Sequence, residues 1–136
     1  VMNSLQRTAF NNNISHLSLT VKNMKSVYRS SDVSRFRILA FDESDVREVR
    51  TPLERSSVIF RQMFYQIRDT NSGDIIVPFD TTYYSTRLST DAEGMFFDFY
   101  MDSLSIGRSY SIDLMIKEMG VDQVFKSVGG RFRVDV

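Results

Sequence analysis

A chain of 136 residues, with 42% hydrophobic and 25% charged side chains, is long enough to fold as one domain around its own core. The absence of cysteine excludes a disulfide scaffold and a thiolate zinc site. The 17 basic residues balance the 17 acidic ones, which argues against a nucleic-acid binder, and no stretch is long and apolar enough for a membrane span. We therefore expect neither a membrane nor a nucleic acid as a partner.

Residues 1–15 show no sustained hydrophobic period, so we expect an extended N-terminal arm ahead of a single domain over residues 16–136. Three large apolar side chains of this arm, those of Leu5, Phe10 and Ile14, would stay in water in a free tail. We expect them to pack on a neighbouring subunit, with Phe10 as the anchor. The alternative is that the arm folds back on its own domain as an extra edge strand.

Alternation of apolar and polar side chains continues through most of the remaining chain and predicts seven or eight short β-strands. Residues 23–34 are predicted to form a polar loop, and residues 43–57 a solvated crossover between two sheets or, as the alternative, a binding element. Turn residues recur between the strands and no helix is indicated, so we predict an all-β, antiparallel two-sheet sandwich. The segments that carry the alternation are 17–22, 35–42, 58–69, 75–79, 94–102, 110–117, 124–128 and 132–136, with a short edge strand near 86–89.

The clearest alternation lies between residues 94 and 117. The residues between the inward-facing positions, which include Ser111 and Asp113, are predicted to face solvent or a partner. Upstream of this stretch, the turn-rich residues 69–74 predict a β-hairpin over residues 61–79. The side chains of this stretch that are predicted to face the core are those of Phe97, Phe99, Met101, Tyr110, Ile112, Leu114 and Ile116.

The connection between the two strands of that stretch has a distinctive spacing. Leu104, Gly107 and Tyr110 follow one another at intervals of three residues. This pattern resembles the tyrosine corner of immunoglobulin-like and fibronectin-type sandwiches, in which a Tyr hydroxyl bonds to the backbone a few residues upstream. The resemblance implies an immunoglobulin-like sandwich of the kind that lacks disulfides. The alternative is an ordinary hairpin loop followed by a core Tyr.

Residues that could carry catalysis or bind a metal are sparse. His16 is the only histidine and no nucleophile motif accompanies it, so we expect no catalytic residue and no enzymatic activity. The acidic clusters 42–45 and 91–94 suit a hard cation but lack the spacing of a calcium loop, so we expect no metal and no cofactor. Glycoside hydrolysis would need a pair of carboxylates at a set separation, which the sequence does not determine. The candidate carboxylates are Asp80, Asp91, Asp98 and Asp102.

The strand-dense, Tyr-rich and cysteine-free make-up of most of the chain is similar to that of accessory domains in the virions of tailed bacteriophages. The resemblance implies a non-enzymatic structural module, located in a virion and otherwise cytoplasmic or unassigned, whose partners are other protein subunits or further copies of itself. Arg makes up 13 of the 17 basic residues and is favoured at protein interfaces. Tyr83 and Tyr84 are the candidate interface residues of the domain. With Tyr100, they also suit the alternative of a carbohydrate-binding or adhesion module.

Overall fold

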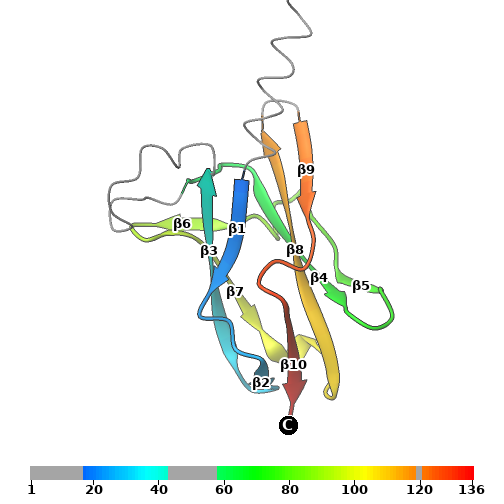
Figure 1. Ribbon diagram of the computed structural model, residues 1–136. Helices are drawn as coiled ribbons and strands as arrows, with labels where there is room; N and C mark the ends of the chain where they lie inside the picture. Colours follow the sequence, from blue (N-terminus) through cyan, green and yellow to red (C-terminus); the bar gives the residue numbers. More distant parts are fainter. Residues whose placement is uncertain (1–16, 43–57, 119–120) are drawn as a thin grey trace, which may run out of the picture.

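The computed structural model describes residues 17–42, 58–118 and 121–136, whose strands form two sheets (Figure 1). The first sheet has four strands in the order β1-β3-β7-β6, and all its neighbouring strands are antiparallel. A 3-10 turn at Met101–Ser103 follows β7 and leads toward the second sheet. The strands of the first sheet are β1 (Leu17–Lys22), β3 (Val33–Asp42), β7 (Gly94–Tyr100) and β6 (Ser89–Asp91).

The second sheet has six strands, with β8 at its centre. β4 pairs along one side of β8, while β10 and β9 pair with successive halves of its other side. β5 extends the sheet beyond β4, and β2 extends it beyond β10. These strands are β2 (Val27–Arg29), β4 (Met63–Asp69), β5 (Ile75–Val77), β8 (Arg108–Glu118), β9 (Val121–Phe125) and β10 (Arg131–Asp135).

The predicted all-β, two-sheet architecture is confirmed in this coarse form, and the predicted hairpin is the antiparallel pair β4–β5. Two details of the prediction are wrong. The pairing of β2 with β10 is parallel, so the sandwich is not wholly antiparallel. The described residues also contain ten strands rather than seven or eight. This strand order does not establish an immunoglobulin-like topology.

Strand β2 was not predicted, because residues 23–34 carry no local alternation. Of its three residues only Tyr28 is buried, and the strand exists through its backbone pairing with β10. Several other strands begin at residues that differ from the predicted ones. The reason is that backbone hydrogen bonds to a partner strand, rather than the alternation of side chains, decide where a strand begins and ends. The observed strands begin at residue 63 in place of 58, at 89 in place of 86 and at 121 in place of 124.

The core lies between the two sheets and is rich in aromatic rings. Tyr65 of β4 stacks on Phe97 of β7 with ring centroids 3.8 Å apart, and Phe36 of β3 lies 5.7 Å from Phe132 of β10. Each pair joins one sheet to the other, so these contacts close the sandwich. The prediction of the inward-facing set between residues 94 and 117 is confirmed, since every member is at most 6% exposed: Phe97, Phe99, Met101, Tyr110, Ile112, Leu114 and Ile116.

The opposite face of β8 corrects the sequence prediction. Ser111 and Asp113 were expected to face solvent or a partner, yet they are only 1% and 0% exposed. The chain after β9 turns back over this face, where the amide of Ser127 donates to a carboxylate oxygen of Asp113 at 3.0 Å. Arg68 and Gln66 from β4 donate to the same carboxylate. The second sheet is therefore covered on both faces around this position.

Tyr110 makes the hydrogen bonds that its spacing from Leu104 and Gly107 predicts. Its hydroxyl donates to the carbonyl of Ser105 at 3.0 Å and accepts from the amide of the same residue at 2.9 Å. The Tyr110 ring is 1% exposed and Leu104 is 5% exposed, while Gly107 has a φ of +86°, where a side chain would be strained. Leu104 and Tyr110 are therefore buried at one corner, and Gly107 lies in the exposed turn between them.

Tyr110→Phe should lower the free energy of unfolding by about 1 kcal/mol or somewhat more, because the N–H and the carbonyl of Ser105 both lose their hydrogen bond to the Tyr110 hydroxyl. Denaturant titration measures the difference. Tyr100→Phe is the matched control, since Tyr100 is 61% exposed and its substitution should leave the midpoint unchanged. If the Tyr110→Phe midpoint coincides with that of the unmodified protein, the hydroxyl contributes nothing to the fold.

Candidate interaction site

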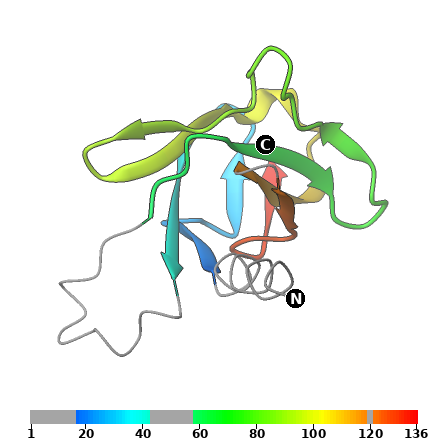
Figure 2. The same ribbon diagram turned by 90° about the horizontal axis from the view of Figure 1, so that it is seen from above.

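The segment that connects β5 to β6 carries the chain from the second sheet to the first. Its last part runs beside the start of β4, where the amide of Tyr65 donates to the carbonyl of Thr86 at 2.9 Å and the amide of Leu88 donates to the carbonyl of Met63 at 2.8 Å. The preceding residues do not pair with a strand, and Figure 2 shows them as a green loop that projects from the body of the two sheets. The loop 80–86 is thus anchored at the edge of the second sheet.

Asp80 holds the shape of this loop. One of its carboxylate oxygens accepts hydrogen bonds from the amides of Thr82 and Tyr83, at 3.1 and 3.0 Å. The other accepts from the hydroxyl and the amide of Ser85. The hydrogen bonds from the Ser85 hydroxyl and from these amides lower the pKa of Asp80 below its ordinary value. At neutral pH, the carboxylate is therefore ionised and occupied by the loop itself.

Tyr83 and Tyr84 form the outer part of the loop. Tyr83 is 84% exposed, the largest exposure among the described aromatic residues. Tyr84 is 49% exposed and its backbone has a φ of +62°, a left-handed conformation that is uncommon for a residue with a side chain. The Tyr84 ring stacks on the buried ring of Phe64, with centroids 6.1 Å apart. Residues with a strained backbone conformation are concentrated at functional sites, where the surrounding structure keeps them in that conformation.

The guanidinium of Arg87 also lies over the Tyr84 ring. Its guanidinium carbon is 5.4 Å from the ring centroid, and its Nε donates to the carbonyl of Arg61 at 3.0 Å. Phe64, Tyr84 and Arg87 therefore form a cluster at the edge of the second sheet. Tyr83, which precedes Tyr84 in the chain, is exposed to solvent. We call these four residues the tyrosine loop site.

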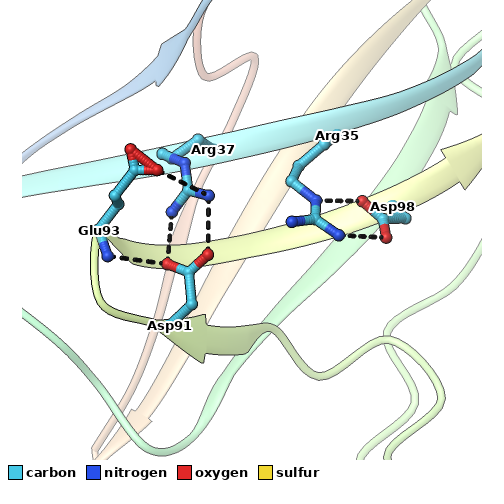
Figure 3. A network of polar contacts seen from close by, with 5 residues as sticks. All are labelled: Arg35, Arg37, Asp91, Glu93 and Asp98. Atoms are coloured by element: carbon cyan, nitrogen blue, oxygen red, sulfur yellow. Dashed lines mark hydrogen bonds and ion pairs between the residues drawn. The ribbon is translucent and has the colours of Figure 1, made fainter.

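A second surface, on the outer face of the first sheet, is formed by paired charges (Figure 3). Arg35 of β3 makes two hydrogen bonds, of 2.8 and 3.0 Å, to the carboxylate of Asp98 on β7. Arg37 spans β7 to reach Asp91 on β6, at 2.8 and 2.9 Å, and lies 3.7 Å from a carboxylate oxygen of Glu93. Each guanidinium on this face therefore has an acidic partner.

These ion pairs keep the carboxylates ionised. The hydrogen bond from Arg37 lowers the pKa of Asp91 to about 2, although desolvation opposes the shift. The hydrogen bond from Arg35 lowers the pKa of Asp98 in the same way. The ring of Phe96 lies beneath both guanidinium groups, 4.1 Å from the guanidinium carbon of Arg35. A carboxylate with so low a pKa does not suit the role of a general acid near neutral pH.

None of the other residues singled out in the sequence is placed by the structure at the tyrosine loop site. Leu5, Phe10, Ile14 and His16 lie outside the described residues, as does most of the acidic cluster 42–45. Tyr100 lies on the outer face of the first sheet, so it belongs to a different surface from the two loop tyrosines.

Neither a cluster of metal-ligating side chains nor a helix suited to cross a membrane is found in the described part of the chain. Across residues 17–42, 58–118 and 121–136, no three His, Asp or Glu side chains come together in a way that could hold a metal ion. In the same residues, no helix is long and apolar enough to cross a membrane.

The comparisons with known proteins do not assign a family. A scan against protein-family models finds no match, and a search of curated proteins finds none either.

The sequence suggests the two tyrosines as candidates but does not indicate the residues that position them. The alternation within β4 places Met63, Tyr65 and Ile67 on the inner face, which leaves Phe64 on the outer face, where the sequence alone indicates no partner for it. Asp80 was considered only as a possible acid, although an Asp followed closely by Thr and Ser residues is also the signature of side-chain-to-backbone turns. That signal could have indicated an ordered loop.

Proposed function

We propose that this chain is a non-enzymatic interaction module that uses the tyrosine loop site to bind another protein subunit of an assembly. The observation that carries the proposal is the side chain of Tyr83, which is 84% exposed on a loop that Asp80 holds in one shape. Tyr supplies a large contact area at a small entropic cost and is enriched among the residues that dominate binding energy. Because the hydrogen bonds to Asp80 already order the loop, binding does not lose the conformational entropy that ordering it would cost.

The polar groups beside the tyrosines favour a protein partner over a carbohydrate. Sugar recognition combines an aromatic face with hydrogen-bonding groups that are free to meet hydroxyls. Each carboxylate oxygen of Asp80 already accepts two hydrogen bonds from the loop, and the Ser85 hydroxyl donates to one of them. These groups therefore have little remaining capacity for a ring of hydroxyls, whereas a protein surface can cover Tyr83 mainly through apolar contact.

The setting that we propose for this assembly is a virion of the tailed-bacteriophage kind, which is what the resemblance in composition implies. In such a particle, the N-terminal arm would provide a second contact through Leu5, Phe10 and Ile14. The arm and the tyrosine loop site would then act as two tethered contacts, each of which raises the effective concentration of the other.

Tyr83→Ser should weaken association roughly 30-fold, the loss expected of a residue that contributes about 2 kcal/mol to binding, and should leave the melting temperature unchanged. The matched control is Tyr100→Ser, since Tyr100 is 61% exposed on the other sheet. Sedimentation velocity of the purified protein measures self-association. Partners captured from a lysate of the source are then purified and titrated against the three proteins.

Two results would contradict the proposal. One is equal binding by the unmodified protein, Tyr83→Ser and Tyr100→Ser. The other is the absence of any protein association of the unmodified chain in either measurement. Loss of binding in Tyr83→Ser together with a lower melting temperature would show instead that Tyr83 supports the loop rather than a partner.

A further inference from the structure

We propose that the tyrosine loop site takes an acidic segment of the partner protein, whose carboxylate pairs with the guanidinium of Arg87. This inference rests on the proposed function, because it specifies the chemistry of the partner that binds beside Tyr83. It is carried by the position of Arg87, by the absence of an acidic partner for it among the described residues and by the Tyr84 ring against which it lies.

The orientation of Arg87 is set from two directions. Its Nε donates to the carbonyl of Arg61 at 3.0 Å, and its guanidinium lies over the ring of Tyr84, with 5.4 Å between the guanidinium carbon and the ring centroid. Tyr84 in turn rests on the buried ring of Phe64. The planar guanidinium is thus held in place at an exposed position before any partner arrives, which reduces the entropy lost when a carboxylate binds to it.

Arg87 differs from most of the arginines that the structure places on strands. Five of these seven form ion pairs with aspartates at 2.8 to 3.0 Å, while Arg29 and Arg131 have no such pair within the described ranges. Arg87 forms none with an acidic residue of the described ranges, and its bonds go to a carbonyl and an aromatic ring. Its charge is therefore available for a partner. The five paired arginines are Arg35, Arg37, Arg68, Arg108 and Arg133.

Charge complementarity indicates the chemistry of the occupant. A guanidinium binds a carboxylate through two parallel hydrogen bonds, a geometry that an amide cannot reproduce. The ring of Tyr84 beside it would exclude water from one side of such a contact and strengthen it. One oriented guanidinium on an aromatic ring, on a loop that also exposes Tyr83, suits a segment in which glutamate or aspartate alternates with apolar residues. A nucleic acid would require a larger basic surface than this site offers.

The test uses two fluorescently labelled synthetic peptides, one repeating Glu-Pro-Leu and the other repeating Gln-Pro-Leu, titrated into the full chain at low salt. We expect the glutamate peptide to bind about tenfold more tightly than the glutamine peptide, with a preference that falls as salt is added. Arg87→Gln should abolish the preference, and Arg87→Lys should retain part of it. Tyr83→Ser should weaken the binding of both peptides.

The matched control is Arg131→Gln, since Arg131 is an exposed arginine on β10, away from the loop, and its loss should leave the preference intact. Melting temperatures of all variants report whether the fold is preserved. Equal binding of the two peptides, binding of neither, or an equal effect of Arg87→Gln and Arg131→Gln would overturn the inference.

Two further outcomes distinguish a failure of this inference from a failure of the proposed function. If a short polyuronate binds in an Arg87-dependent manner and the glutamate peptide does not, the site recognises acidic sugars and the inference of a protein segment is wrong. If Tyr83→Ser abolishes protein association while Arg87→Gln has no effect on it, the proposed function stands and only the acidic character of the partner is refuted.

Discussion

Asp113→Ala should lower the free energy of unfolding by about 3–5 kcal/mol, the range for breaking a buried ion pair by removing one partner. Asp113 is fully buried and accepts hydrogen bonds from Gln66, from Arg68 and from the amide of Ser127. Its removal leaves the Arg68 charge without its acidic partner and two further donors without an acceptor. Denaturant titration of the variant measures the loss.

The control for this prediction is Asp122→Ala. Asp122 pairs with Lys117 on the exposed surface of the same sheet, at 3.3 Å, so its removal should barely move the midpoint. Asp113→Asn retains the shape but not the charge and should fall between the two. If Asp113→Ala unfolds at the same denaturant concentration as Asp122→Ala, the buried network contributes nothing to stability.

The same carboxylate should make stability depend on pH. Burial raises the pKa of Asp113, but the hydrogen bonds from Arg68, from the Ser127 amide and from Gln66 outweigh burial and leave the pKa below its ordinary value. A carboxyl group whose pKa is lower in the folded state contributes stability above its unfolded pKa, near about 4, and loses that contribution as pH falls through the folded value. The Asp113→Ala difference should therefore shrink in acid.

Phe132→Ala should also cost about 3–5 kcal/mol, because it leaves a cavity at the centre of the aromatic core. The Phe132 ring is 1% exposed and lies 5.5 Å from the ring of Tyr28, 5.7 Å from that of Phe36 and 6.0 Å from that of Tyr110. Phe36 belongs to the first sheet and the other three residues to the second. The substitution thus removes a contact between the sheets as well as packing within one of them.

Phe132→Leu is the matched variant, since it fills most of the space and should cost less than the alanine substitution. Tyr100→Ala removes an aromatic ring from the exposed face of the first sheet and should leave the denaturation midpoint nearly unchanged. A Phe132→Ala variant as stable as Tyr100→Ala would show that the two sheets are held together elsewhere.

The amino-acid sequence by itself determined which side chains of β7 and β8 enter the core. Between residues 94 and 117, the period-two alternation names the inward-facing residues correctly, because a strand places alternate side chains on opposite faces whatever its neighbours are. The turn cluster at residues 69–74 likewise indicates the β4–β5 hairpin. The spacing of Leu104, Gly107 and Tyr110 indicates a corner in which Tyr110 bonds to the backbone of Ser105. All of these are local properties of a few consecutive residues.

Only the tertiary structure decided how the strands are paired and which outward-facing residues are covered. Strand β2 exists because the last strand of the chain lies beside it, and Asp113 is buried because the segment around Ser127 folds over it. In the same way, the stack of Tyr84 on Phe64 brings the loop against the outer face of β4. Such contacts join residues far apart in the chain, and they depend on the register and packing of whole sheets. The alternation within a single strand carries no information about either.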